Sequence, residues 1–443
     1  MLQPPPCPLP VVLLLIRMTL SSSSASLSQL FWVAVGLIFE CKSQLSILKR
    51  GSCLVFTMNE EALIDVEAEA GTQAAQFDQL SEDVMEEILS RLPFQSIVSA
   101  SAVCKRWHTL LQPGTYCRRL AACNFIHRPW FFLVGLNHFL PAKNQAFGYD
   151  PEKNQFHPFP AFEMPPYDHG SLTGTHGLLF ALTGSGICKL GYTSCLINNS
   201  SWKETPPLLY SRRSPIAAMV TDPDSLNHEG APACQIVVAG GKSLENQLVV
   251  EIYDSNVDMW RQCAPLPPEF QFSSSSQWMH SAVFDGKFIA YETHTGCMAW
   301  LDLNQGRWSK TSVLRPMNPV YCFLVACGKS LVLAALYRES PCFKLWSVNL
   351  ATLQCAELGH MPEELFALFD EEDDEKDPLF TCVGGGDFIY IYSDSWHKDY
   401  LACACDLSGG MVTWRKLPQL PSPVNRFDKV VCFSSSIMPD SCV

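Results

Sequence analysis

The feature that most constrains the fold is a unit of about 50 residues that recurs from residue 129 towards the C-terminal end. Each unit contains an apolar strand, glycines, a second apolar strand, a Tyr/Asp-type strand and an aromatic residue followed by proline. The clearest copies lie at residues 235–267 and 384–418, with Trp260 and Trp414 as their aromatic anchors. A period of this length predicts a mainly β fold, a β-propeller with four strands in each blade.

The aromatic anchors set the number of blades. They are Phe156, Trp202, Trp260, Trp308 and Trp414. The last interval is about twice the others, and residues 346–350 mark a degenerate blade inside it. The sequence therefore predicts six blades, at residues 129–160, 171–207, 215–267, 279–313, 320–358 and 379–421. The first lacks an innermost strand, so we expect residues 429–433 to supply it and to close the ring without an exposed edge.

The composition agrees with an ordered protein rich in short strands. Of the 443 residues, 47% are hydrophobic and 17% are charged, which is too apolar for general disorder. The 31 prolines and 25 glycines fit many turns better than a helical bundle. A net charge of −13 disfavours nucleic acid or an anionic membrane as the principal ligand. The 20 irregularly spaced cysteines indicate buried free thiols in a reducing compartment, the cytoplasm or the nucleus.

Residues 1–57 differ in composition from the rest of the chain. Their apolar runs are shorter than the roughly 20 residues that span a bilayer, and the first residues lack the basic region of a signal peptide. An acidic stretch follows from Met58. We interpret residues 1–57 as a disordered or spurious extension and residues 58–76 as an acidic linker; a membrane or secretion signal is the alternative.

Residues 77–122 have a helical apolar period instead. Ser81 can cap a helix whose first turn holds Glu82 and Asp83, and Pro93 ends it. The apolar face of this helix consists of Val84, Ile88, Leu89 and Leu92. Two further segments carry Ile97 and Ala100, then Val103, Trp107, Leu110 and Leu111. Helices this short bury little surface by themselves, so we expect their apolar face to dock onto something else.

Three motifs in this helical segment resemble an F-box. They are Leu80-Ser81-Glu82-Asp83-Val84, Ile88-Leu89-Ser90-Arg91-Leu92-Pro93 and Val103-Cys104-Lys105-Arg106-Trp107. Ser81 stands where the family usually has proline, but serine also suits a helix start. The resemblance implies docking to the Skp-type adaptor of a cullin-RING ubiquitin ligase. The positions implied to form or support that contact are Leu80, Val84, Ile88, Leu89, Leu92, Pro93, Ile97, Val103, Cys104 and Trp107.

The whole of residues 77–435 resembles the plant F-box/kelch-repeat proteins. The segment Arg128-Pro129-Trp130-Phe131-Phe132-Leu133 after the helices is typical of them, and residues 129–435 would form the kelch-type propeller. This resemblance implies the substrate-recognition subunit of an SCF (Skp–cullin–F-box) ubiquitin ligase, with the propeller binding an unidentified protein substrate. Such a subunit performs no catalysis and needs no cofactor.

Motifs for catalysis or metal binding are weak. Gly-Lys-Ser occurs at residues 241–243 and 328–330, but Ile236 and Phe323 stand where a phosphate-binding loop needs glycine, so we interpret both as blade turns. Cys403 and Cys405 have no matching pair of ligands for a metal. The sequence therefore predicts no catalytic residue, no metal and no cofactor.

Aromatic, histidine and arginine side chains in the inter-strand loops are the candidate substrate-binding residues, because protein-binding hot spots use these types. They are Tyr167, His169, Trp278, His294, Arg338, Trp396 and His397. The acidic run at residues 370–377 is either a solvated loop or a docking site for a basic partner. Two other functions remain open: an enzyme acting on a small molecule in the propeller channel, and an F-box co-regulator that does not direct degradation.

Overall fold

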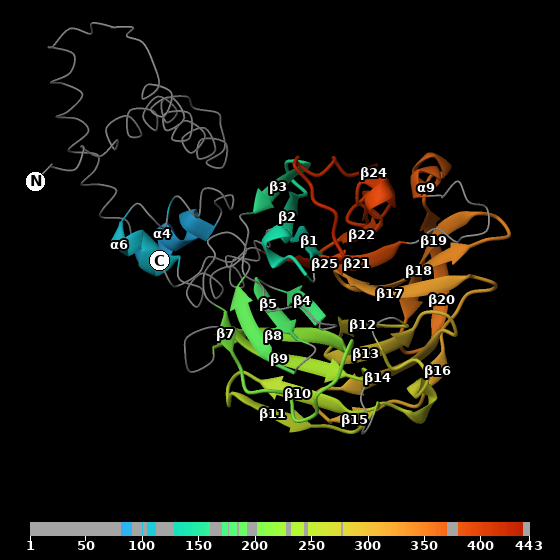
Figure 1. The fold of residues 1–443 in the computed structure, drawn as a ribbon, viewed down its shortest axis with the longest axis horizontal. Helices are drawn as coiled ribbons and strands as arrows, with labels where there is room; N and C mark the ends of the chain where they lie inside the picture. The colour runs from blue at the N-terminus through green and yellow to red at the C-terminus, as the bar shows by residue number, and fades with distance from the viewer. Residues whose placement is uncertain are drawn as a thin grey trace, which may run out of the picture. The chain divides into compact units, whose positions relative to one another are not determined.

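A computed structural model gives the fold of the chain (Figure 1). It describes residues 81–90, 100, 104–111, 128–137, 139–159, 171–175, 177–183, 186–192, 202–226, 232–242, 247–275, 278–369 and 380–436. The chain divides into two compact units, residues 1–111 and 112–443. In the described residues no helix is long and apolar enough to cross a membrane.

The first unit contains two described helices, α4 (Glu82–Ser90) and α6 (Lys105–Leu110). The Ser81 hydroxyl accepts a hydrogen bond from the Val84 amide at 3.5 Å, as expected of a capping residue. The Cys104 sulfur does the same for the Trp107 amide at 3.5 Å, so Cys104 begins α6. Apolar side chains from both helices are buried, namely Met85, Leu89 and Leu110, and Leu111 directly after α6 is buried as well.

The second unit consists of six blades, each an antiparallel sheet of four strands or more, as the repeat predicts (Figure 1). From the innermost strand outwards, blade 1 has β25 (Lys429–Ser435), β1 (Trp130–Leu136), β2 (Gln145–Asp150) and β3 (Gln155–Phe159). Blade 2 has β4 (Ser171–Thr175), β5 (Leu178–Leu182), β6 (Cys188–Tyr192) and β7 (Lys203–Glu204). Blade 3 has β8 (Ile216–Leu226), β9 (Pro232–Ala239), β10 (Val250–Asp254) and β11 (Met259–Gln262). Blade 4 has β12 (Met279–Phe284), β13 (Lys287–Glu292), β14 (Cys297–Asp302), β15 (Arg307–Trp308) and β16 (Ser312–Val313). Blade 5 has β17 (Tyr321–Cys327), β18 (Ser330–Tyr337), β19 (Cys342–Asn349) and β20 (Gln354–His360). Blade 6 has β21 (Thr381–Gly385), β22 (Phe388–Tyr392), β23 (Ala402–Asp406) and β24 (Thr413–Lys416).

Blade 4 departs from the simple four-strand pattern. Its outer edge is split, because β15 and β16 both pair with β14, at Leu301–Asp302 and Cys297–Met298 respectively. Four short helices lie in the described connections of the propeller: η2 (Pro141–Lys143), η3 (Pro268–Phe270), α9 (Glu363–Phe369) and η4 (Trp396–Lys398).

The C-terminal strand closes the ring, as expected from the apolar tail. All of β25 pairs antiparallel with β1, from Lys429 opposite Leu136 to Ser435 opposite Trp130. Each innermost strand lies against the innermost strands of both neighbouring blades, and β25 lies between β21 and β4. The ring of Phe433 stacks on that of Phe132 with centroids 5.1 Å apart, so the closing strand adds apolar contact as well as backbone pairing.

The tryptophan anchors join neighbouring blades. Trp260 donates from Nε1 to the Pro206 carbonyl at 2.8 Å, and Trp308 donates to the Ala264 carbonyl at 2.9 Å. Both acceptors lie in the segment that leads out of the preceding blade. Trp260 is buried among side chains of blades 2 and 3, while Trp308 packs beside the core shared by blades 3 and 4. Trp260 and Trp308 therefore both fill the inter-blade core and fix the connection from the preceding blade, whereas the indole nitrogen of Trp414 is buried without a hydrogen-bond partner in the described part of the chain.

The antiparallel order of the strands gives the propeller two faces. One, which we call the turn face, carries the connections from first to second and from third to fourth strand of each blade. The other, which we call the loop face, carries the connections from second to third strand and from one blade to the next. The turn-face connections between described strands are short. Loop-face connections can be longer, as at residues 263–278 and 417–428.

A repeated local device builds the turn face. In every blade except blade 2, the last residue of the third strand is Asp or Asn, and its side chain accepts backbone N–H groups of the turn. The residues concerned are Asp150, Asp254, Asp302, Asn349 and Asp406. Each of these turns also contains a residue with positive φ, such as Gly306 at 65°. This chemistry explains the Tyr/Asp strands of the sequence repeat.

Candidate functional site

The predicted adaptor-binding residues fall partly within the described structure. Leu80, Leu92, Pro93, Ile97 and Val103 lie outside the described residues, and for Ile88 only the backbone in α4 is described. Val84 is 45% exposed and Leu89 is 1% exposed. Cys104 is exposed and Trp107 is half-buried. Val84 and Cys104 thus offer surface to a partner, while Leu89 supports the helical unit from inside.

The predicted substrate-binding residues that the structure describes all lie on the loop face. Trp278 precedes the first strand of blade 4, and His294 joins the second and third strands of the same blade. Arg338 occupies the equivalent connection of blade 5, and Trp396 and His397 that of blade 6. Tyr167 and His169 lie outside the described residues. Five residues chosen for their chemistry alone are therefore gathered on one face by the strand order.

Trp278 and His294 form the core of an aromatic group at the end of blade 4. Their ring centroids are 5.4 Å apart, and the ring of Tyr321 lies 6.4 Å from that of His294. Below them the Glu292 side chain is buried and accepts the amides of His294 at 3.2 Å and Thr295. These bonds fix the connection between β13 and β14. Trp278 is 41% exposed.

A histidine nearby has a different environment. The imidazole of His280, on β12, meets the ring of Phe323 edge-on at 4.9 Å. Burial lowers the pKa of His280 to about 4, so the side chain is neutral in the folded protein near neutral pH. His280 therefore packs between blades 4 and 5 and does not belong to the exposed aromatic group.

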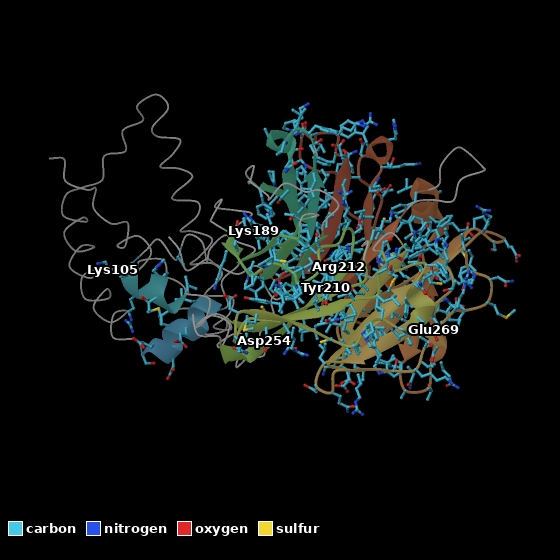
Figure 2. All side chains as sticks on the ribbon, turned by 60° about the horizontal axis from the view of Figure 1, so that its bottom comes forward. Lys105, Lys189, Tyr210, Arg212, Asp254 and Glu269 are labelled. Carbon is cyan, nitrogen blue, oxygen red and sulfur yellow. The ribbon has the colours of Figure 1, made fainter. Side chains whose placement is uncertain are left out.

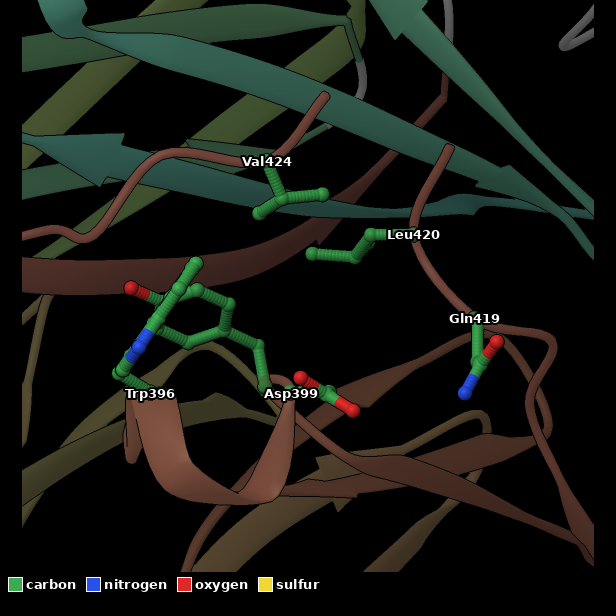
Figure 3. A pocket seen from close by; sticks show the side chains of 6 residues that line it. Trp396, Asp399, Gln419, Leu420 and Val424 are labelled. Carbon is green, nitrogen blue, oxygen red and sulfur yellow. The ribbon is translucent and has the colours of Figure 1, made fainter. Parts of the chain in front are cut away.

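Trp396 lies beside a small pocket at the junction of blades 6 and 1 (Figure 3). The pocket has a volume of about 170 Å³ and is lined by Trp396, Asp399, Tyr400, Gln419, Leu420 and Val424. The Tyr400 hydroxyl accepts the Phe427 amide at 2.8 Å and donates to the Asn425 carbonyl at 3.3 Å. These bonds join the two chain segments that form the pocket. Figure 3 shows Leu420 and Val424 across the pocket from the turn that carries Trp396.

Exposed apolar side chains distinguish the two faces further. On the loop face they are Phe139, Leu140, Ile187, Leu209, Phe272, Met317 and Leu368, besides Trp278 and Trp396. In the described turn-face connections they are Val257 and Met411. Sequence reasoning missed the aliphatic and phenylalanine members because an isolated apolar residue between strands has no periodicity to mark it. The loop face has the aromatic and apolar composition of a protein-binding surface.

Comparison with known proteins finds an F-box domain and relatives that match most of the chain. The F-box domain model matches residues 77–112. The chain is 24% identical over 356 residues to the F-box/kelch-repeat protein At1g23390 of Arabidopsis thaliana, covering 76% of this chain and 84% of that one. It is 29% identical over 340 residues to the F-box/kelch-repeat protein At3g61590 of the same plant, covering 71% and 79%. The chain therefore contains an F-box domain, and over most of its length it is similar to F-box/kelch-repeat proteins.

Among solved structures, TolB from Acinetobacter baumannii aligns over 69% of this chain and 66% of its own, with 10% identity and a TM-score of 0.41. No function follows from a similarity of that size.

The thiols of this protein are free wherever the structure describes them. Burial raises the pKa of Cys188 and of Cys403 to about 12, so neither is a thiolate near neutral pH. Within the same described part, no three His, Cys, Asp or Glu side chains are placed together to hold a metal ion.

Proposed function

We propose that this protein is the substrate-recognition subunit of an SCF-type ubiquitin ligase. In this proposal the F-box docks a Skp-type adaptor, and through it a cullin-RING ligase, while the loop face of the propeller binds a protein substrate. The observation that carries the proposal is an F-box preceding a closed propeller with an aromatic, apolar face. The protein would act without catalysis of its own, by raising the effective concentration of substrate near the ubiquitin-charged enzyme.

The adaptor contact is tested best at an exposed position of α4. Val84→Glu places a charge on a side chain that is 45% exposed, so it should leave the helix intact and abolish co-purification of the adaptor. Met411→Glu, on the turn face of the propeller, is the matched control and should retain the adaptor. Retention by the Val84 variant would contradict adaptor docking through this surface.

The substrate contact is tested by comparing partners of the wild-type protein with those of loop-face variants under proteasome inhibition. Trp278→Ala and Trp396→Ala should lose partners that accumulate when the proteasome is blocked, while the adaptor stays bound. If the lost partners do not accumulate on inhibition, a non-degradative co-regulator replaces the receptor proposal.

We propose that this function is exercised in the cytoplasm or the nucleus. Free thiols, in a chain with 20 cysteines, support a reducing compartment. A fluorescent fusion of the full chain should distribute between these two compartments, and retention in the secretory pathway would contradict the proposal.

A further inference from the structure

Three segments of the chain meet at the loop-face end of blade 3. They are residues 211–215 before β8, residues 240–242 after β9 and residues 271–275 with Trp278 before β12. Arg213 and Lys242 exchange both backbone hydrogen bonds, at 3.0 and 2.7 Å, as an isolated antiparallel bridge. The Gly241 amide donates to the Ser274 carbonyl at 2.6 Å, which fixes the third segment against the other two.

The bridge places two cations directly opposite each other. Paired residues of an antiparallel bridge project side chains from the same side, and like charges in that position repel. Both side chains are exposed, and neither has a carboxylate partner in the part of the chain that the structure describes. Two carboxylates of adjoining segments are otherwise engaged: Glu251 is buried against Arg212, and Glu269 accepts from the Thr311 hydroxyl at 2.7 Å. Figure 2 labels Arg212 and Glu269 on the propeller.

Exposed apolar side chains lie in the third segment, which the Gly241–Ser274 hydrogen bond joins to the bridge. Phe272, two residues before Ser274, is 96% exposed. Trp278 ends the same connection and is partly exposed beside His294. We call Arg213, Lys242, Phe272 and Trp278 the basic–aromatic patch. An exposed phenylalanine is unfavourable in water unless a partner covers it, and an uncompensated pair of cations is relieved by an anion.

We propose that the basic–aromatic patch binds an acidic segment of a partner protein. Asp or Glu carboxylates of that segment would pair with Arg213 and Lys242, and a neighbouring apolar side chain would cover Phe272 and Trp278. Charge complementarity favours an acidic occupant, because Arg213 and Lys242 are two exposed cations side by side on a chain whose net charge is −13. The inference rests on the proposed function, because it names the chemistry of the substrate that the loop face would recognise.

The test measures peptide binding to the full chain co-purified with its adaptor, by fluorescence anisotropy. One labelled peptide has Asp and Glu around leucine, and its matched peptide has Asn and Gln instead. We expect the acidic peptide alone to bind, more weakly at higher salt. Arg213→Gln and Lys242→Gln should each weaken binding by about fivefold, the upper range for an exposed ion pair. Phe272→Ser should weaken it too, without disturbing a fold in which that ring is exposed.

Matched variants separate charge at this patch from charge elsewhere. Lys143→Gln removes an exposed cation from the loop face of blade 1, and Met411→Ser removes an exposed apolar residue from the turn face; neither should change the affinity. Equal binding of the two peptides would overturn the proposal, as would a strong preference for the same peptide with phosphoserine.

The acidic residues 371–375 of the chain itself are the remaining rival occupant. Replacing them with Asn and Gln should leave the affinity of the acidic peptide unchanged, whereas a tenfold rise would assign the patch to this segment and overturn the proposal. Adaptor co-purification is measured in the same preparations. If the double variant Arg213→Gln, Lys242→Gln keeps the adaptor and binds the acidic peptide as tightly as the wild type does, the patch proposal fails while the receptor proposal stands.

Discussion

The two faces of the propeller are built by different means. On the turn face the described connections are short, and the third strands of blades 1, 3, 4, 5 and 6 end in an Asp or Asn that makes the same hydrogen bonds to its turn. On the loop face the connections differ in length, sequence and helix content, and they are held by single long-range contacts such as that between Tyr400 and Phe427. The repeat therefore fixes one face and leaves the other free to vary, which is the condition for a specific binding surface.

Removing the closing strand should have the largest effect, because it affects both faces at once. Deletion of residues 429–443 leaves β1 without its partner and exposes the apolar surface covered by Phe433. We expect a loss on the order of 5 kcal/mol, seen as loss of soluble monomer or a large fall in the thermal midpoint. Deletion of residues 1–57 is the comparison and should leave the thermal midpoint of the propeller unchanged. A stable C-terminal truncation would contradict ring closure by β25.

Removing one partner of a buried ion pair should destabilise the loop-face end of its blade more than the turn-face end. Glu251 on β10 and Arg212 are both fully buried, and Glu251 also accepts the Leu209 amide at 2.6 Å. Glu251→Ala leaves the Arg212 cation buried without its counter-charge, so we expect a loss of about 3 to 4 kcal/mol in the free energy of unfolding. Chemical denaturation measures it. The double variant Arg212→Met, Glu251→Leu should recover most of the loss, and failure to recover would contradict the charge explanation.

Acid should destabilise the propeller through His280. Its pKa of about 4 lies below the ordinary value of 6.5, so between those values the unfolded chain binds more protons than the folded protein. The stabilisation is complete above pH 6.5 and is lost as the pH falls towards 4, by up to about 3 kcal/mol. Denaturation midpoints across this range should show the dependence. It should diminish in His280→Phe and persist in His294→Gln; an unchanged dependence in His280→Phe would show that other groups cause it.

A single turn-face residue should have a smaller and purely local effect. Asp302 accepts the amides of Asn304 at 3.0 Å and Gln305 at 2.9 Å. Asp302→Ala should lower the free energy of unfolding by about 1 kcal/mol, since the turn is exposed and water can replace the lost acceptor. Peptide and substrate binding should be unaffected. An altered affinity would show that the turn face is not separate from the binding surface.

Local chemistry explains what could be predicted from the sequence. Six blades, four strands in each and the closing tail follow from apolar alternation and from anchors such as Trp260, all of which act within one repeat. Ser81 was recognisable as a helix cap for the same reason. The split outer edge of blade 4 was not predicted, because its two short strands have no alternation to reveal them.

Long-range contacts explain what could not be predicted. The pocket beside Trp396 needs Leu420 and Val424, which reach it only because the chain crosses from blade 6 to the closing strand. The bridge between Arg213 and Lys242 joins the connection before β8 to the connection after β9, and the repeat pattern does not show that these two connections pair. The gathering of Trp278, His294 and Trp396 on one face likewise follows from strand order rather than from their spacing.

The most direct test of the account is substrate ubiquitination by the reconstituted ligase, with partners captured by the full chain as substrates. The account predicts that Val84→Glu abolishes both adaptor binding and ubiquitination, whereas Trp278→Ala with Trp396→Ala abolishes substrate capture and ubiquitination while the adaptor stays bound. Met411→Glu, on the turn face, should behave as the wild type. Ubiquitination that survives the loop-face variants, or that is lost in the turn-face variant alone, would contradict the division of the propeller into a structural face and a binding face.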